Sequence, residues 1–171
     1  AYEIDNLLSL IARRYVPKYE DFEPVHTKVT LPKPANYSKM VREKIYKDIV
    51  LNTGGRSRIA KKTMTSGVVM GYDMMGERYV YEDNTHKLDW LEDFLLDTDE
   101  VVAVFYAYNV ELHALEKMLN KIGKSYIVIN GATKDKYYEL NHKQYDVVLG
   151  QFQAMSESLD GLHLKCHIEV F

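Results

Sequence analysis

Hydrophobic and polar positions follow two different patterns along this chain, and the change falls near residue 86. From there on, short apolar runs of strand length alternate with longer amphipathic runs of helix length. VVAVFYAY and DVVLGQF are typical of strands buried on both faces, whereas HKLDWLEDFLLD and ELHALEKMLNKIG have apolar residues at helical spacing. Strands separated by such helices predict an α/β domain at residues 86–171, with a parallel sheet and helices on both of its faces.

The first half of the chain has a weaker pattern, and we predict that residues 1–85 form a mainly helical lead-in segment that packs on the α/β domain. Apolar positions recur at helical spacing in residues 2–15 and again in residues 37–50. Between these two helices, VHTKVTL at residues 25–31 alternates like an extended strand.

Two glycine-containing segments of the first half invite a functional interpretation. Gly54 and Gly55 follow the second predicted helix, but the GGRS sequence lacks the glycine spacing and the Lys-Ser/Thr pair of a phosphate loop. We interpret it as a plain loop. Residues 72–77 have the turn residues of an ordinary hairpin, and we assign them no chemistry.

The composition limits which cellular compartment and which class of protein we expect. Hydrophobic residues make up 46% and charged residues 27% of the 171 residues, as in a globular protein. No apolar run approaches the roughly 18 residues that a membrane-spanning helix needs, and the first residues do not resemble a signal peptide. The single cysteine, Cys166, excludes an internal disulfide. We therefore expect a cytoplasmic protein without a membrane partner.

Charge is unevenly distributed, although the net charge of −3 gives no overall attraction to nucleic acid. Residues 39–62 contain eight Lys and Arg residues but only two acidic ones, Glu43 and Asp48. A solvated helix face is the ordinary explanation, and a polyanion-binding surface is the alternative.

No set of residues indicates a catalytic or a metal site. The histidines never pair with a carboxylate or a cysteine at metal-ligand spacing, and no serine or cysteine lies in a recognisable nucleophile motif. We therefore predict no catalytic residue and no metal site in this chain.

Three loops follow the predicted strands, at residues 109–110, 131–134 and 151–161. Ligands bind outside the carboxyl ends of the strands in parallel sheets of this kind. The third loop is rich in amides, hydroxyls and carboxylates. An ordinary connection between strands would explain that composition, and a contact site for a nucleotide or nucleic acid is the functional alternative.

The same segments resemble the second RecA-like lobe of superfamily-two helicases in its Swi/Snf-like form, of the phage or prophage type. HKLDWLEDFLLDTDEVVAVFYAY resembles the helix and strand that open this lobe and lead into the fourth motif, and INGATKDK resembles the segment after the next strand. DVVLGQFQAMSESLDGL resembles the fifth motif, and TLPKPANYSKMVREKIYKDI resembles the helix that leads into the lobe. The resemblance implies a RecA-like fold and an ATP-dependent DNA helicase or translocase.

Positions in these motifs imply a role for individual residues. The resemblance implies nucleotide contacts by Glu157, Asp160 and Gly161, and nucleic-acid contacts by Asn109, Gly131, Thr133, Gln151, Gln153 and Ser156. Met155 and Ser158 depart from the family pattern, because glycine is usual at both positions.

The resemblance also implies cofactors and partners of a longer parent protein. ATP and Mg²⁺ would be its cofactors, and duplex or single-stranded DNA and the first RecA-like lobe would be partners of this lobe. The phosphate loop and the acidic Mg²⁺-binding motif belong to that first lobe, and the arginine-bearing sixth motif would follow CHIEVF. We expect this chain to be a fragment that neither holds these cofactors nor hydrolyses ATP alone.

Two other functions remain open on the residues themselves. A stand-alone nucleic-acid or protein interaction module could keep the same fold, with the basic residues 39–47 and the tyrosines making phosphate and stacking contacts. An unrelated small α/β enzyme is the third possibility, but a nucleophile, a metal set and a phosphate loop are all missing.

Overall fold

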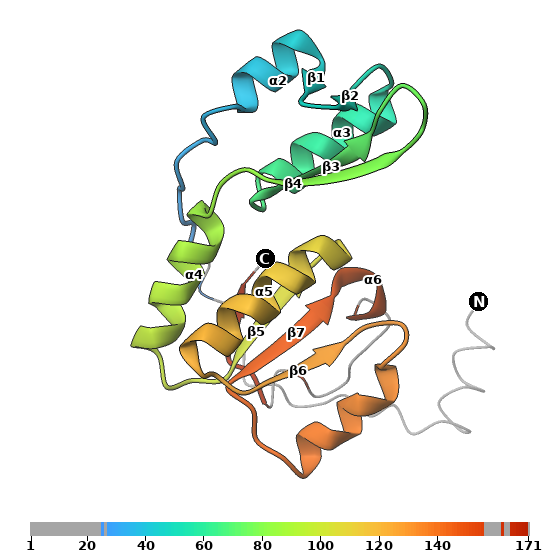
Figure 1. The fold of residues 1–171 in the computed structure, drawn as a ribbon. Coiled ribbons are helices and arrows are strands. Elements are labelled where there is room, and N and C mark those ends of the chain that lie inside the picture. Colours follow the sequence, from blue (N-terminus) through green and yellow to red (C-terminus); the bar gives the residue numbers. More distant parts are fainter. Residues whose placement is uncertain (1–24, 26, 156–161, 163–164, 171) are drawn as a thin grey trace, which may run out of the picture. The chain divides into compact units, whose positions relative to one another are not determined.

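The computed structural model describes residue 25, residues 27–155, residue 162 and residues 165–170 (Figure 1). The chain divides into two compact units, Ala1–Thr30 and Leu31–Phe171. The helix predicted at residues 2–15 lies outside the described residues. The strand predicted at residues 25–31 does not form in its described part, where Val25 and Val29 are 92% and 43% exposed. No neighbouring strand pairs with these described residues, and a strand needs such a partner for its backbone groups.

Four parallel strands form the sheet predicted for the second half. They are β5 (Val102–Tyr106), β6 (Tyr126–Ile129), β7 (Val147–Gln151) and β8 (Ile168–Val170), in the order β6-β7-β5-β8. β7 pairs with β5 and with β6, and β5 pairs with β8, all in parallel. The structure thus confirms an α/β arrangement with a parallel sheet.

Helices cover both faces of this sheet. Val102, Val104 and Tyr106 of β5 pack with α4 (His86–Asp97) and α5 (Asn109–Ile122), whereas Ala103 faces the opposite core. That second core includes Leu140 of the 3₁₀ helix η1 (Lys134–Asn141). The short helix α6 (Phe152–Met155) follows β7. Alternate residues of each strand point to opposite faces, so a strand buried on both sides is apolar throughout.

Residues 31–84 contain both helices and strands, so the described part of the lead-in segment is not mainly helical. Its elements are α2 (Tyr37–Glu43), β1 (Ile45–Tyr46), β2 (Ile49–Val50), α3 (Gly54–Met64), β3 (Val68–Tyr72) and β4 (Arg78–Glu82). They share a core that includes Met40, Ile49, Met64 and Val69.

The single helix predicted over residues 37–50 is wrong. α2 ends at Glu43, because Lys44 adopts the left-handed conformation with φ 53°. Lys47 has φ 51° and turns the chain back, so β1 and β2 pair antiparallel. Met40, Tyr46 and Ile49 nevertheless all reach one core.

The plain loop predicted at the GGRS sequence is also wrong, because Gly54 and Gly55 are the first residues of α3. The hydroxyl oxygen of Thr53 accepts a hydrogen bond from the backbone N–H of Arg56 at 3.2 Å and caps the helix. Deeper in α3, the buried hydroxyl oxygen of Thr63 accepts a bond from the Met70 N–H at 3.2 Å, which ties the helix to β3.

The hairpin predicted around residues 72–77 is confirmed. β3 and β4 pair antiparallel, and the Asp73 carboxylate accepts hydrogen bonds from the Met75 and Glu77 backbone N–H groups, both at 2.8 Å. At the other end of the hairpin, Gly67 has φ 92° and a side chain there would collide with the Asn84 carbonyl group. Only glycine fits this turn without strain.

Candidate nucleic-acid interface

Five of the sequence-predicted contact residues lie at one edge of the parallel sheet. β6, β7 and β5 are neighbours and run in the same direction, so the segments that follow them leave at their shared carboxyl edge (Figure 1). These segments hold Asn109, Gly131, Thr133 and Gln153, and Gln151 is the last residue of β7. The other four predicted residues, Ser156, Glu157, Asp160 and Gly161, lie outside the described residues.

The loop after β6 is built by its own side chains. The Asn130 side-chain oxygen accepts hydrogen bonds from the backbone N–H groups of Ala132 at 2.9 Å and Thr133 at 3.1 Å. The Thr133 hydroxyl donates to the Val128 carbonyl oxygen at 2.8 Å. The Thr133 hydroxyl therefore stabilises the loop. Gly131 is exposed, and a side chain at this position would meet no other atom.

The start of α5 depends on Glu111, a residue that the sequence analysis missed. One carboxylate oxygen of this buried side chain accepts the backbone N–H groups of Ala107 at 2.7 Å and Tyr108 at 3.0 Å. These bonds fix the chain between β5 and α5 and leave Asn109 exposed at the first position of the helix. A glutamate three residues after a helix cap is a recognised sequence signal for this arrangement.

The exit from β7 is closely packed. Gly150 lies under Met155, and a side chain at Gly150 would come within 2.9 Å of two Met155 atoms. The Phe152 ring packs on Phe105 with centroids 5.5 Å apart. Met155, which departs from the family pattern, thus occupies space beside the backbone of β7. Gln151 is half-buried here and Gln153 is exposed.

Tyr106 places a buried hydroxyl group at the carboxyl end of β5. The Asn130 side chain lies near this hydroxyl group, but no described atom forms a hydrogen bond of normal geometry with it. Burial raises the pKa of Tyr106, and Asn130 lowers it in part. The hydroxyl therefore stays protonated and can only act as a neutral donor or acceptor.

The sheet edge offers neutral hydrogen-bonding groups rather than positive charge. Residues 85–171 contain eight Lys and Arg residues against fourteen Asp and Glu residues, whereas residues 31–84 contain ten against six. Amides and hydroxyls can donate to phosphate oxygens and position a strand, but they supply no long-range attraction.

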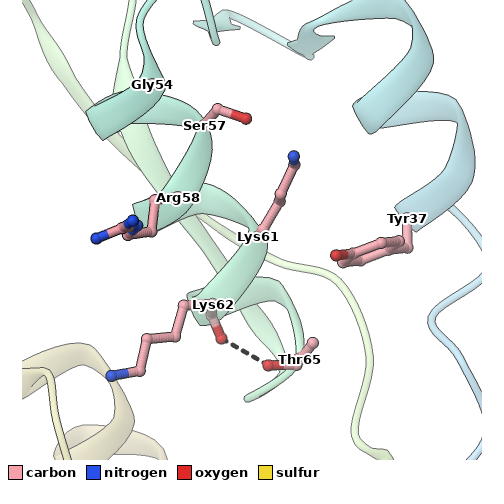
Figure 2. Close-up of a pocket in the computed structure, with 7 residues that line it drawn as sticks. All are labelled: Tyr37, Gly54, Ser57, Arg58, Lys61, Lys62 and Thr65. Atoms are coloured by element: carbon pink, nitrogen blue, oxygen red, sulfur yellow. Dashed lines mark hydrogen bonds between the residues drawn. The ribbon is translucent and has the colours of Figure 1, made fainter.

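Positive charge gathers instead around α3. An open hollow of about 530 Å³ is lined by Tyr37, Gly54, Ser57, Arg58, Lys61, Lys62 and Thr65. Figure 2 shows Lys61 on the side of α3 that faces Tyr37, while Arg58 and Lys62 extend from the other side of α3. The Lys62 Nζ atom also lies 5.6 Å from the centroid of the Tyr108 ring, next to Asn109.

Other kinds of site find little support in the described part of the chain. No group of three or more His, Cys, Asp or Glu residues among the described residues could hold a metal ion. Burial, with a smaller effect of Glu169, raises the pKa of Cys166 to about 11, so its thiol is not an activated nucleophile. Within the described ranges, no helix is long and apolar enough to cross a membrane.

Comparisons of the chain with protein-family models, with curated proteins and with solved structures find no match.

Proposed function

We propose that this chain is the second RecA-like lobe of an ATP-dependent DNA helicase or translocase of the superfamily-two, Swi/Snf-like kind. The main support is the position of three separate sequence segments. Those that resemble the fourth motif, the segment after the next strand and the fifth motif include the carboxyl ends of β5, β6 and β7, and these neighbouring strands end at one edge. Segments distant in the sequence thus meet where such a sheet binds ligands.

The described residues at this edge have the chemistry of a nucleic-acid backbone contact. Asn109 and Gln153 are exposed amides, and Gly131 exposes backbone in a loop that is hydrogen-bonded internally. Such groups donate hydrogen bonds to phosphate oxygens without reading the base sequence. In a motor of two lobes, they would hold one DNA strand while the cleft between the lobes opens and closes.

In the proposed motor, residues of both lobes would bind ATP and Mg²⁺. When bound, ATP with Mg²⁺ supplies the phosphoryl-transfer chemistry that drives the motor. Glu157, Asp160 and Gly161 would contact the nucleotide from this chain. The described edge residues, which are amides and hydroxyls, do not fit Mg²⁺, whose protein ligands are chiefly carboxylates. The first RecA-like lobe would provide the metal ligands and the phosphate loop.

A matched pair of glutamine variants tests the contact at the sheet edge. Gln153→Ala removes an amide at the carboxyl edge, and Gln144→Ala removes the same group from the segment that precedes β7, at the amino edge. We expect Gln153→Ala to weaken binding of labelled duplex or single-stranded DNA about five-fold, as the loss of one hydrogen bond predicts. Fluorescence anisotropy at several salt concentrations measures this, and thermal unfolding checks that both variants fold. Equal binding by the two variants would contradict the proposal.

A nucleic-acid-binding or protein-binding module without motor activity is the second candidate, and the basic character of residues 31–84 favours it. Nucleotide distinguishes the two functions. In a motor lobe, ATP changes DNA affinity when the first lobe is present, and Asp160→Ala reduces that response. In a module, ATP leaves DNA affinity unchanged.

A further inference from the structure

We propose that the exposed face of α3 is a second binding surface for nucleic acid, separate from the sheet edge, which holds phosphate groups of a DNA strand. This surface, called the α3 basic face below, consists of Arg58, Lys61 and Lys62 with the neighbouring Tyr37, Ser57 and Thr65. That the polyanion is DNA rests on the proposed function, whereas the anion-binding character rests on the geometry and charge of α3 alone.

The fold leaves one side of α3 for the cations. Ala60, Thr63 and Met64 are buried against the core of residues 31–84. Arg58, Lys61 and Lys62 have the spacing i, i+3 and i+4, so they lie on the part of the helix surface that the buried residues leave free. Lys61 lies at one border of this surface, and Arg58 and Lys62 lie at the other (Figure 2). No Asp or Glu occurs between Asp48 and Asp73, so α3 has no acidic residue of its own.

Two carboxylates of residues 31–84 accept hydrogen bonds from neutral side chains, and neither forms an ion pair with a described cation of α3. Asp83 accepts hydrogen bonds from the Tyr46 hydroxyl at 2.7 Å and from the Asn36 amide at 3.0 Å. Asp48 accepts a short hydrogen bond from the Tyr81 hydroxyl, and this bond is the main cause that raises the pKa of Tyr81 to about 12.

The cations themselves are largely unpaired. Within the described residues, Arg58 and Lys61 form no hydrogen bond and no ion pair, and Arg42–Glu43 is the one ion pair between described residues of the 31–84 segment. The positive charge of the α3 basic face therefore remains available to an external anion.

The shape of the face fits repeated phosphates better than a single small anion. A small anion needs donors that converge on one point, but Figure 2 shows Lys61 on one side of α3 and Arg58 and Lys62 on the other. A strand offers one phosphate after another to such dispersed charges. The Tyr37 ring opposite Lys61 adds a surface on which a base can stack.

This surface would also supply what the sheet edge lacks. Residues 85–171 have an excess of acidic residues, so they repel a polyanion at long range. Cations on α3 would attract the strand and increase the rate of association, while the amides at the sheet edge would fix its position.

A charge-matched comparison tests the inference in the full chain. Arg58→Gln with Lys61→Gln removes two charges from the α3 basic face, and Lys87→Gln with Lys117→Gln removes two from exposed positions on α4 and α5. We expect the α3 pair to weaken duplex DNA binding at least ten-fold at low salt. It should also reduce the slope of log K against log salt by about 2, roughly one per lost phosphate contact.

Further measurements separate a lost contact from a lost fold. The charge-conserving Arg58→Lys with Lys61→Arg should keep both affinity and slope, and circular dichroism should show the same melting curve for all variants. Binding by the α3 pair equal to that of the α4–α5 pair would overturn the inference. A competition experiment with inorganic phosphate gives a second way to overturn it. If phosphate abolishes DNA binding of the unaltered chain, but not of the α3 pair, and does so with the affinity of a dedicated phosphate site, the face binds a single small anion rather than a strand.

The outcome for the sheet edge is read independently. If the α3 pair loses binding while Gln153→Ala matches Gln144→Ala, the α3 surface stands and the proposed role of the sheet edge fails. If only Gln153→Ala loses binding, the α3 inference fails and the proposed function stands. If the unaltered chain binds no DNA at low salt, both fail.

Discussion

Asp146 connects the amino ends of β6 and β7 through its carboxylate. One oxygen accepts hydrogen bonds from the Ser125 backbone N–H and from the Ser125 hydroxyl, both at 2.6 Å. These bonds from Ser125 are the main cause of a lowered pKa for Asp146. The charged form is therefore the form that the folded state prefers, and this single residue links stability to pH.

Asp146→Asn keeps the shape of the side chain but removes its charge. At neutral pH we expect the free energy of unfolding to fall by about 1 kcal/mol, a value reduced for solvent exposure. Because the folded pKa lies below the unfolded value of about 3.9, this contribution is complete above that value and is lost as the pH falls through the folded pKa. Urea unfolding at neutral and acidic pH measures the difference, which should disappear at the acidic end.

Asp99→Asn is the control for Asp146→Asn. Asp99 is exposed, and among the described residues its side chain forms no hydrogen bond, so the variant removes the same charge without the Ser125 contacts. A similar loss of stability in both variants would show that net charge, rather than the bond to Ser125, is responsible.

The helix α5 depends on the contact between its first turn and the end of β5. Glu111→Ala would leave the Ala107 and Tyr108 N–H groups without their acceptor, and we expect a loss of about 2 kcal/mol in the free energy of unfolding. Glu111→Gln retains an acceptor oxygen of the same reach, so its loss should be clearly smaller. Chemical denaturation of both variants measures this. Equal losses would mean that the charge of Glu111 matters more than its hydrogen bonds.

The same helix start also matters for the proposed DNA contact, because Asn109 is its first residue. A displaced helix start would move the Asn109 amide relative to Gln151 and Gly131 at the ends of the neighbouring strands. The sheet edge therefore depends on a residue that does not itself face the ligand.

At the scale of the whole molecule, β8 is an edge strand whose outer backbone groups can affect the association of chains. In the described sheet, β8 pairs with β5 on one side and forms the end of the order β6-β7-β5-β8. Unpaired backbone groups along the outer side of an edge strand can form hydrogen bonds with a second copy of the chain. We predict self-association at high concentration through this strand.

Light scattering over a range of concentrations tests this prediction. The apparent mass should rise toward that of a dimer, and Glu169→Lys, which places a lysine on the exposed edge, should reduce the rise. A constant monomer mass at the highest concentration would contradict it.

Local sequence pattern was sufficient for most of the second half of the chain. The apolar run at residues 101–108 and the helical spacing from Glu111 to Ile122 predict their elements without help from distant residues. The loop predicted at residues 109–110 is wrong, because α5 already begins at Asn109. Gly123 ends α5 in the left-handed conformation with φ 72°, as a glycine at that position predicts. The rule for parallel sheets then located the candidate site at the carboxyl edge, where five of its predicted residues lie.

In residues 31–84 the same kind of pattern gave the right apolar positions but the wrong elements. Met40, Tyr46 and Ile49 do share one core, yet short apolar spacings fit a helix and a tight hairpin equally well. The left-handed conformations of Lys44 and Lys47 decided between them, and non-glycine residues give little sequence signal for that conformation.

Sequence alone therefore determined which residues are apolar, where the alternating strands and helices of the second half lie, and that α3 has no acidic neighbour in the chain. Tertiary structure decided the order β6-β7-β5-β8, the helical start at Gly54 and the burial of Glu111. The physical reason is that periodicity reflects burial of single segments. The order of the strands depends instead on which distant segments pack together. The same holds for a helix that begins at residues of low helix propensity and for a buried polar side chain, because distant segments supply their packing and hydrogen bonds.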